Sequence, residues 1–290
     1  MFVDLHVHTI LSDDSTLAVS DAFDRAAEIG LGAIGITDHD TTAGFLDARN
    51  AALRTDVSFI PGVEVSSSFS GHMVHLLVYT DRIDQPRIQK FLDDDVFTAK
   101  RRHLLPILQA LHGAGFPVSA AGFDEEVRLH GRGGAPMSRY LERQGIIDIF
   151  SKHKHEKFLS GVLPGFERPD WAPPAEKCIS VAHICGAAVV VAHPHSSGIG
   201  SEEELNQLRK MGIDGLEIYH PLHTNEQQEH LRRFAKKHGL LITGGSDYHE
   251  RPGPETHPMG KPGLELIDRH LLPVLHLRDL LEPGEFTITG

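Results

Sequence analysis

The 290-residue chain is long enough to bury a large core, either as one barrel-sized domain or as two domains. Its composition, 40% hydrophobic and 23% charged, is that of an ordinary globular protein. The formal net charge of -12 argues against charge-driven binding to duplex DNA. It leaves room for a small anionic partner, because bound cations can dominate the local field of a pocket.

The chain shows no sign of a membrane segment or of export. No apolar stretch approaches the roughly 18 residues that a membrane span needs. The first strand is expected from Phe2 and a candidate ligand follows at His6, which argues against a signal peptide. Cys178 and Cys185, the only cysteines, do not suggest a disulfide framework. We therefore expect a cytoplasmic protein without a membrane partner.

Short apolar runs alternate with segments of helical periodicity along most of the chain. Strands are expected at residues 2–7, 33–37, 57–65, 72–79, 187–192, 215–219 and 240–243. Helices are expected at residues 20–29, 43–53, 202–211 and 226–238. Repeated β-α units predict parallel strands with right-handed crossovers. We favour an α/β barrel over an open doubly wound sheet, because side chains from many strands must converge on one point.

Residues 100–165 interrupt this alternation. They begin with a basic helical segment at Lys100, Arg101 and Arg102, continue through the glycine-rich run 131–134, and hold a His/Lys cluster at 152–157. This composition predicts a small helical insertion that overhangs the barrel mouth. The barrel itself is then formed by residues 1–99 and 166–290.

Seven short runs carry side chains that bind metal ions, and most of them follow expected strands. They are His6-Val7-His8, Asp13, Thr37-Asp38-His39-Asp40, Gly62-Val63-Glu64, His75, Ala192-His193-Pro194 and Gly244-Gly245-Ser246-Asp247-Tyr248-His249. Imidazole and carboxylate are ligands for Zn, Mn and Fe, and cysteine is absent from every run. A single His-x-His pair is a weak signal. The joint pattern, spread over most of the chain, predicts a multinuclear metal site.

Together these runs resemble the PHP family, the polymerase and histidinol phosphatase family of metal-dependent phosphoesterases, nearly from end to end. The resemblance implies a distorted seven-stranded (β/α)7 TIM-like barrel with two or three divalent ions, Mn, Fe or Zn, of which Mn is favoured.

The resemblance also implies a ligand set for each ion. It comprises His6, His8, Glu64 and Asp247 for a first metal; Asp13, His39 and bridging Glu64 for a second; and His75, His193 and His249 for a third. Asp14 is the alternative to Asp13. Asp38 and Asp40 are expected to orient the ligating imidazoles.

The insertion is similar to that of the PHP branch acting on nucleoside 3′,5′-bisphosphates and short 5′-phosphorylated RNA. The similarity lies in Gly131-Arg132 and in Ser138-Arg139-Tyr140-Leu141, although the His that relatives place after Gly-Arg is missing here. Arg102, Arg132 and Arg139 are therefore candidates for binding a second phosphate. The run from Glu217 to His223 also resembles that branch and makes His223 a candidate near the leaving group.

The resemblance implies hydrolysis of a phosphoester by a metal-activated water. His6, His8, Glu64, Asp247 and His223 are the expected catalytic residues. The expected reaction removes the 3′-phosphate of a nucleoside 3′,5′-bisphosphate and leaves a 5′-monophosphate. Four alternatives are a 5′-3′ exoribonuclease on short RNA, a histidinol-phosphate phosphatase, an amidohydrolase-type C–N hydrolase and a non-catalytic metal-binding module.

Overall fold

The computed structural model describes residues 2–81, 86–148, 158, 161, 171–252, 257–262 and 264–265. Its centre is an eight-stranded sheet with the order β7-β6-β5-β4-β3-β2-β1-β8. The strands are β1 (Phe2–Val7), β2 (Ala33–Ile36), β3 (Ser58–Phe69), β4 (His72–Tyr79), β5 (Ala188–Val191), β6 (Gly215–Tyr219), β7 (Leu241–Gly244) and β8 (Leu264–Glu265). The seven strands expected from the sequence are all present.

The prediction of parallel strands throughout was wrong for β4. This strand is antiparallel to both β3 and β5, whereas β1–β2–β3 and β5–β6–β7 are parallel. Only Ser70 and Gly71 connect β3 to β4, both with positive φ, at 50° and 78°. A two-residue turn of this kind makes a hairpin and is too short for a parallel crossover.

The chain after β7 returns to β1 and brings two ligand-bearing segments together. Tyr248 N–H donates to the His6 carbonyl at 3.3 Å, and His8 N–H donates to the Tyr248 carbonyl at 3.0 Å. A Cβ on Gly245 would lie 2.3 Å from the Cβ of His6, so this close approach requires glycine. Asp247 is thereby held beside the end of β1. Closure into a barrel by a ladder between β7 and β1 remains a prediction.

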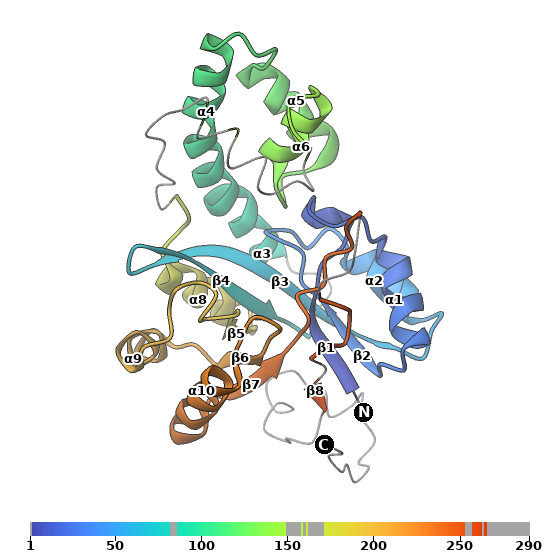
Figure 1. Ribbon diagram of the computed structural model, residues 1–290, viewed down its shortest axis with the longest axis vertical. Helices are drawn as coiled ribbons and strands as arrows, with labels where there is room; N and C mark the ends of the chain where they lie inside the picture. Colours follow the sequence, from blue (N-terminus) through green and yellow to red (C-terminus); the bar gives the residue numbers. More distant parts are fainter. Residues whose placement is uncertain are drawn as a thin grey trace.

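Six of the described helices pack in two groups against the same face of the strands, one group beside β1 and β2 and the other beside β4 to β7 (Figure 1). They are α1 (Val19–Glu28), α2 (Phe45–Ala52), α3 (Pro86–Phe91), α8 (Ala175–Ile184), α9 (Glu202–Met211) and α10 (Asn225–His238). The sequence fixes the start of α9, because Ser201 and Glu204 form a reciprocal capping box. The apolar side of α9, with Leu205 and Leu208, packs into the main core. Among the described helices, none is both long and apolar enough to cross a membrane.

The insertion stands above the sheet as a separate group of helices (Figure 1). A π-helical turn at Leu92–Phe97 leads into α4 (Thr98–Gly113), which is followed by α5 (Ala120–His130) and α6 (Pro136–Arg143). These helices have their own core, around Leu108, Phe123 and Leu141. The predicted His/Lys cluster at 152–157 lies outside the described residues.

Candidate metal centre

The first group of ligand side chains lies where β1, β3 and the segment after β7 meet. His6, His8, Glu64 and Asp247 place one ligating atom each within 4.8 Å of all the others. His6 Nε2 is 3.3 Å from Glu64 Oε2, and His8 Nε2 is 3.2 Å from Asp247 Oδ1. The two-residue period of β1 explains why both imidazoles project to the same side. These are the four residues expected for the first metal.

A buried carboxylate sets the proton position on His6. His6 Nδ1 lies 3.0 Å from Glu217 Oε1, and His193 N–H donates to Glu217 Oε2 at 2.8 Å. Because a carboxylate only accepts hydrogen bonds, His6 carries its proton on Nδ1 and directs the Nε2 lone pair into the ligand group. The sequence analysis gave Glu217 no role of this kind. Its signal was a charged residue within an otherwise apolar strand.

Ser12 fixes the proton of His8 in the same way. The Ser12 hydroxyl donates to Asp38 Oδ1 at 2.9 Å and accepts the His39 backbone N–H at 3.0 Å. Its second lone pair faces His8 Nδ1 at 2.8 Å and must accept from that nitrogen. His8 therefore also presents a lone pair at Nε2. Asp38 orients this imidazole through Ser12 and not by direct contact.

The arrangement fits a divalent cation. The Nε2 atoms of His6 and His8 are 3.0 Å apart, with both lone pairs directed into the group. Glu64 Oε2 lies near them, yet among the described residues it has no hydrogen-bond partner. Burial opposes protonation of His8, but Asp247 and Glu64 raise its pKa to about 10, which shows how strongly the group attracts positive charge. Converging imidazole and carboxylate donors suit Mn, Fe or Zn.

The second group contains His8, Asp14, His39 and His249. Asp14 Oδ2 is 3.0 Å from His249 Nε2, and Asp14 Oδ1 is buried with no hydrogen-bond partner among the described residues. Burial lowers the pKa of His39 to about 3, which keeps this imidazole neutral and able to ligate. This group contains Asp14, the expected alternative to Asp13, and His249, which the sequence analysis assigned to the third metal.

Asp14, the alternative to Asp13 as a ligand of the second metal, lies in this group, whereas Asp13 does not. Asp13 has left-handed backbone geometry, with φ of 65°, and this turns its carboxylate away from the histidines. That carboxylate is held by Arg139 and by the Ala135 N–H. His249, expected with the third metal, lies instead with Asp14.

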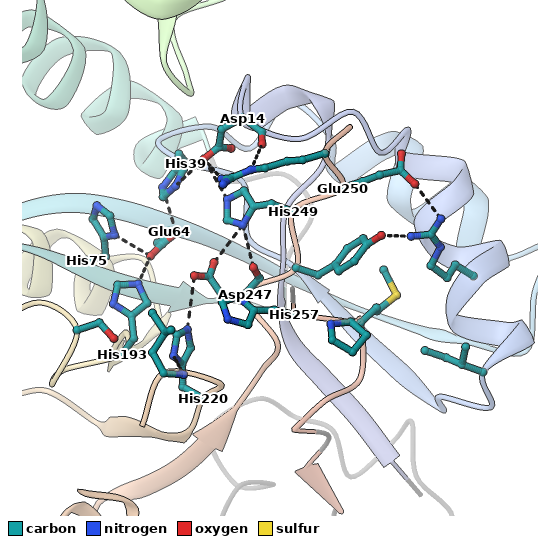
Figure 2. Close-up of a pocket in the computed structure, with 18 of the residues that line it drawn as sticks. Asp14, His39, Glu64, His75, His193, His220, Asp247, His249, Glu250 and His257 are labelled. Atoms are coloured by element: carbon teal, nitrogen blue, oxygen red, sulfur yellow. Dashed lines mark hydrogen bonds and ion pairs between the residues drawn. The ribbon is translucent and has the colours of Figure 1, made fainter. Parts of the chain in front are cut away.

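Glu64 belongs to the first group and also to a third, which contains His39, Glu64 and His75 (Figure 2). Its Oε2 is 3.0 Å from His39 Nδ1, while its Oε1 is 2.9 Å from His75 Nδ1 and 3.0 Å from His193 Nε2. Burial opposes ionisation of Glu64, but His39, His75 and His6 lower its pKa well below the usual range. Glu64 is therefore a buried anion at the centre of the predicted ligands, which is the position of a bridging carboxylate.

Comparisons with known proteins relate the chain to metal-dependent phosphoesterases. Residues 4–114 match the model of the PHP domain. The chain is 29% identical over 260 residues to the 5′-3′ exoribonuclease Rnm of Escherichia coli, covering 85% of both chains. It is 27% identical over 252 residues to the 3′,5′-nucleoside bisphosphate phosphatase of Chromobacterium violaceum, covering 85% of this chain and 87% of that protein.

A solved protein from Bifidobacterium adolescentis, assigned as a metal-dependent phosphoesterase, superposes with a TM-score of 0.72 at 26% identity. It covers 89% of this chain and 91% of its own. The protein is a metal-dependent phosphoesterase with a PHP-domain match over residues 4–114. The resemblance drawn from the motifs is confirmed.

The phosphoesterase has a cavity of about 990 Å³ that begins at the metal ligands. From there its wall continues along His220, Arg251 and His257 to Arg25 on α1. The predicted leaving-group residue His223 packs beside His220 and hydrogen-bonds through Nδ1 to the Ile218 carbonyl at 2.9 Å. Burial lowers the pKa of His223 to about 4. Figure 2 shows His220 directed at Asp247, and His220 rather than His223 is among the residues that line the cavity.

The three arginines expected to bind a second phosphate do not meet at this cavity. Among the described residues, its wall includes Arg25 and Arg251 but none of Arg102, Arg132 and Arg139. Arg132 lies 3.4 Å from Asp93, and Arg102 is exposed on α4. Arg102, Arg132 and Arg139 all belong to the insertion. The insertion contacts the backbone of His39 and the side chain of Asp13, next to the second ligand group.

Asp40, expected to orient an imidazole, serves another purpose. Its carboxylate accepts hydrogen bonds from Ser66 and from Lys100 Nζ, which is 2.6 Å away. Burial raises the pKa of Asp40, but Lys100 outweighs it and lowers the value overall. Asp40 thus links the insertion to β3.

Replacing Asp14 tests its proposed role as a ligand. Asp14→Asn is expected to weaken metal binding more than the roughly 10- to 100-fold typical of losing an outer hydrogen-bond partner, because a charged oxygen beside His249 is lost. Metal retained per chain at buffered free Mn²⁺ measures this. Asp24→Asn, an exposed change on α1, is the matched control. Unchanged retention in Asp14→Asn would exclude Asp14 as a ligand.

Proposed function

We propose that the phosphoesterase removes the 3′-phosphate of nucleoside 3′,5′-bisphosphates and releases 5′-monophosphates. The observation that carries this proposal is the size and lining of the cavity, whose volume is about 990 Å³ and whose wall includes both the proposed metal ligands and Arg251. A single phosphate at the metals would leave most of this volume unfilled. The Chromobacterium violaceum relative bears the name of this activity.

The chain's own residues prepare the reacting end of the cavity. Metal ions bound there would activate a water molecule and neutralise charge on the reacting phosphoryl group. Glu217 and Ser12 hold the imidazoles of His6 and His8 with their lone pairs directed inward. Burial opposes ionisation of Asp247, but the neighbouring His6 lowers its pKa well below the usual range, so that it stays an anion.

His220 is the best candidate for contact with the leaving oxygen. The Leu222 backbone N–H donates to His220 Nδ1 at 3.2 Å, so a neutral His220 carries its proton on Nε2. That nitrogen is buried at the cavity wall, 3.5 Å from Asp247 Oδ2, with no hydrogen-bond partner among the described residues. It can donate a hydrogen bond to an oxygen that gains charge during bond cleavage.

Arg251 is the proposed ligand of the second phosphate. Its Nε donates to the Asp14 carbonyl at 3.0 Å and its Nη2 lies 3.6 Å from Asp14 Oδ2, yet the side chain remains 41% exposed. A guanidinium has five N–H donors, so several remain for a phosphate. Arg25 is less available, because it is paired with Glu250 at 2.8 Å and hydrogen-bonded to Tyr248.

Phosphate release from paired substrates tests the proposal. We expect the 3′,5′-bisphosphate to exceed the matching 3′-monophosphate in kcat/KM by roughly 10- to 100-fold, the equivalent of one charge-assisted hydrogen bond of about 1.5–3 kcal/mol. Arg251→Ala should remove most of this difference, while Arg102→Ala, which lies away from the cavity, should keep it. Equal kcat/KM for the two substrates would contradict the second-phosphate site. Release of the 5′-phosphate would reverse the assigned polarity.

Stepwise 5′-3′ hydrolysis of short RNA is the second candidate. It is favoured by the openness of the cavity wall, where Leu222 is 56% exposed and Ile29 is 50% exposed, so that a longer leaving chain has a surface to follow. The Escherichia coli relative is named for this activity. A 5′-phosphorylated trinucleotide in the same assay separates the two candidates. Histidinol phosphate and a simple amide complete the panel.

A further inference from the structure

The insertion contacts the segments after β1 and β2 that carry residues of the second ligand group. Contact is made by the 131–135 loop, which connects α5 to α6. Gly134 N–H donates to the carbonyl of His39 at 2.7 Å. Ala135 N–H donates to Asp13 Oδ2 at 2.9 Å. One loop therefore holds the backbone of one proposed ligand and the residue that precedes another.

Glycines allow this loop to approach so closely. A Cβ on Gly133 would lie 2.4 Å from the Cβ of Thr41, and one on Gly134 would lie 2.6 Å from Asp13 Oδ2. Gly134 also has a positive φ of 64°. The Gly133-Gly134 pair is thus explained by contact with the barrel.

Two buried cations of the insertion reinforce the contact. Arg139 Nη1 donates to both Asp13 oxygens, at 2.5 and 2.6 Å, while its Nε donates to Glu126 at 2.8 Å. Lys100 Nζ donates to Asp40 Oδ2 at 2.6 Å. The Arg139 and Asp13 side chains are only 12% and 7% exposed. Water screens such pairs little, so they hold their geometry firmly.

The two aspartates held in this way, Asp13 and Asp40, are the sequence neighbours of the proposed ligands Asp14 and His39. Asp13 precedes Asp14, and Asp40 follows His39. Both Asp13 and Asp40 have left-handed backbone conformations, with φ of 65° and 53°, which non-glycine residues seldom adopt unless their surroundings impose them. The contacts with Arg139 and Lys100 are part of those surroundings.

We propose that the insertion is a positioning element for the second metal, with Arg139 and Lys100 as positioning residues that hold Asp14 and His39 in place. The first group is held mainly by other elements, because His6 and Glu64 lie on β1 and β3 and Glu217 on β6 supports His6. This role is independent of which phosphoester is hydrolysed. Removing the Arg139 or Lys100 contact should therefore lower the affinity of the second metal site more than that of the others.

Metal titration of the full chain tests the proposal. Metal-free protein is equilibrated with buffered free Mn²⁺, and bound metal per chain is measured at each concentration. Arg139→Met should shift one class of sites to roughly 10- to 100-fold higher free Mn²⁺, the usual effect of losing an outer hydrogen-bond partner, and leave the remaining sites in place. Lys100→Met should shift the same class. The readout is metal content and does not require turnover.

Arg128→Met is the matched control, because Arg128 lies on α5 and, among the described residues, pairs with Glu125 three residues earlier in its own helix. The double variant Asp13→Asn with Arg139→Met avoids leaving a buried carboxylate unpaired, and serves where Arg139→Met alone is poorly folded. A selective shift in either variant, with an unchanged Arg128→Met, supports the proposal. Wild-type titration curves, or an equal shift of all sites, would overturn it.

Discussion

Glu64→Gln is expected to release bound metal and to lower phosphate release by more than roughly 100-fold, beyond the loss typical of an outer-sphere change. The carboxylate is fully buried, with Oε2 facing His39 and Oε1 facing His75 and His193. Glutamine keeps the shape but removes the charge, and turns one ligating oxygen into an N–H donor. Metal content and phosphate release per chain are the two measurements.

The matched control is Glu203→Gln, an exposed change on α9 far along the chain from the ligand segments. It should retain both metal and activity. A Glu64→Gln protein that kept its full metal content would show that this carboxylate does not bridge the ligand groups, and the assignment of the centre would have to be redrawn.

Glu217→Gln is expected to weaken metal binding by roughly 10- to 100-fold without removing any ligand. In the wild-type protein both Glu217 oxygens accept hydrogen bonds, one from His6 Nδ1 and one from the His193 backbone N–H. An amide offers only one acceptor, so either orientation sets an N–H donor against another donor. The His6 ring would then turn or change its tautomer, and its Nε2 would no longer present a lone pair to the first metal.

Metal titration distinguishes this role from a purely structural one. If Glu217 orients His6, the first-site affinity falls while the metal-free protein, folded by its unchanged core, shows a far-ultraviolet spectrum like that of the wild type. If Glu217→Gln bound the first metal with wild-type affinity, the prediction would be wrong, and β1 alone would be sufficient to orient His6. Glu203→Gln again provides the comparison for a charge change at an exposed position.

Local patterns in the sequence were sufficient to predict most of the strands and the first ligand group. Apolar runs mark buried strands, and the two-residue period of a strand puts His6 and His8 on one side. Glu64 follows from its place in β3, where a single ionisable residue interrupts an apolar run. The end of β3 was missed, because Ser66 and the serines after it suggest a loop. Their polar groups are satisfied within the fold, for example by Asp40.

The sequence alone thus determined the type of chemistry, metal-dependent hydrolysis with imidazole and carboxylate as the candidate ligands, because the residue types themselves specify which ligand atoms are present. Tertiary structure decided which neighbour takes part. At the left-handed turn formed by Asp13, Asp14 lies among the candidate ligands, whereas Asp13 pairs with Arg139. An arginine's charge is visible in the sequence, but its partner is not. A long, flexible side chain pairs with whatever carboxylate the fold brings within reach, and only packing fixes that choice.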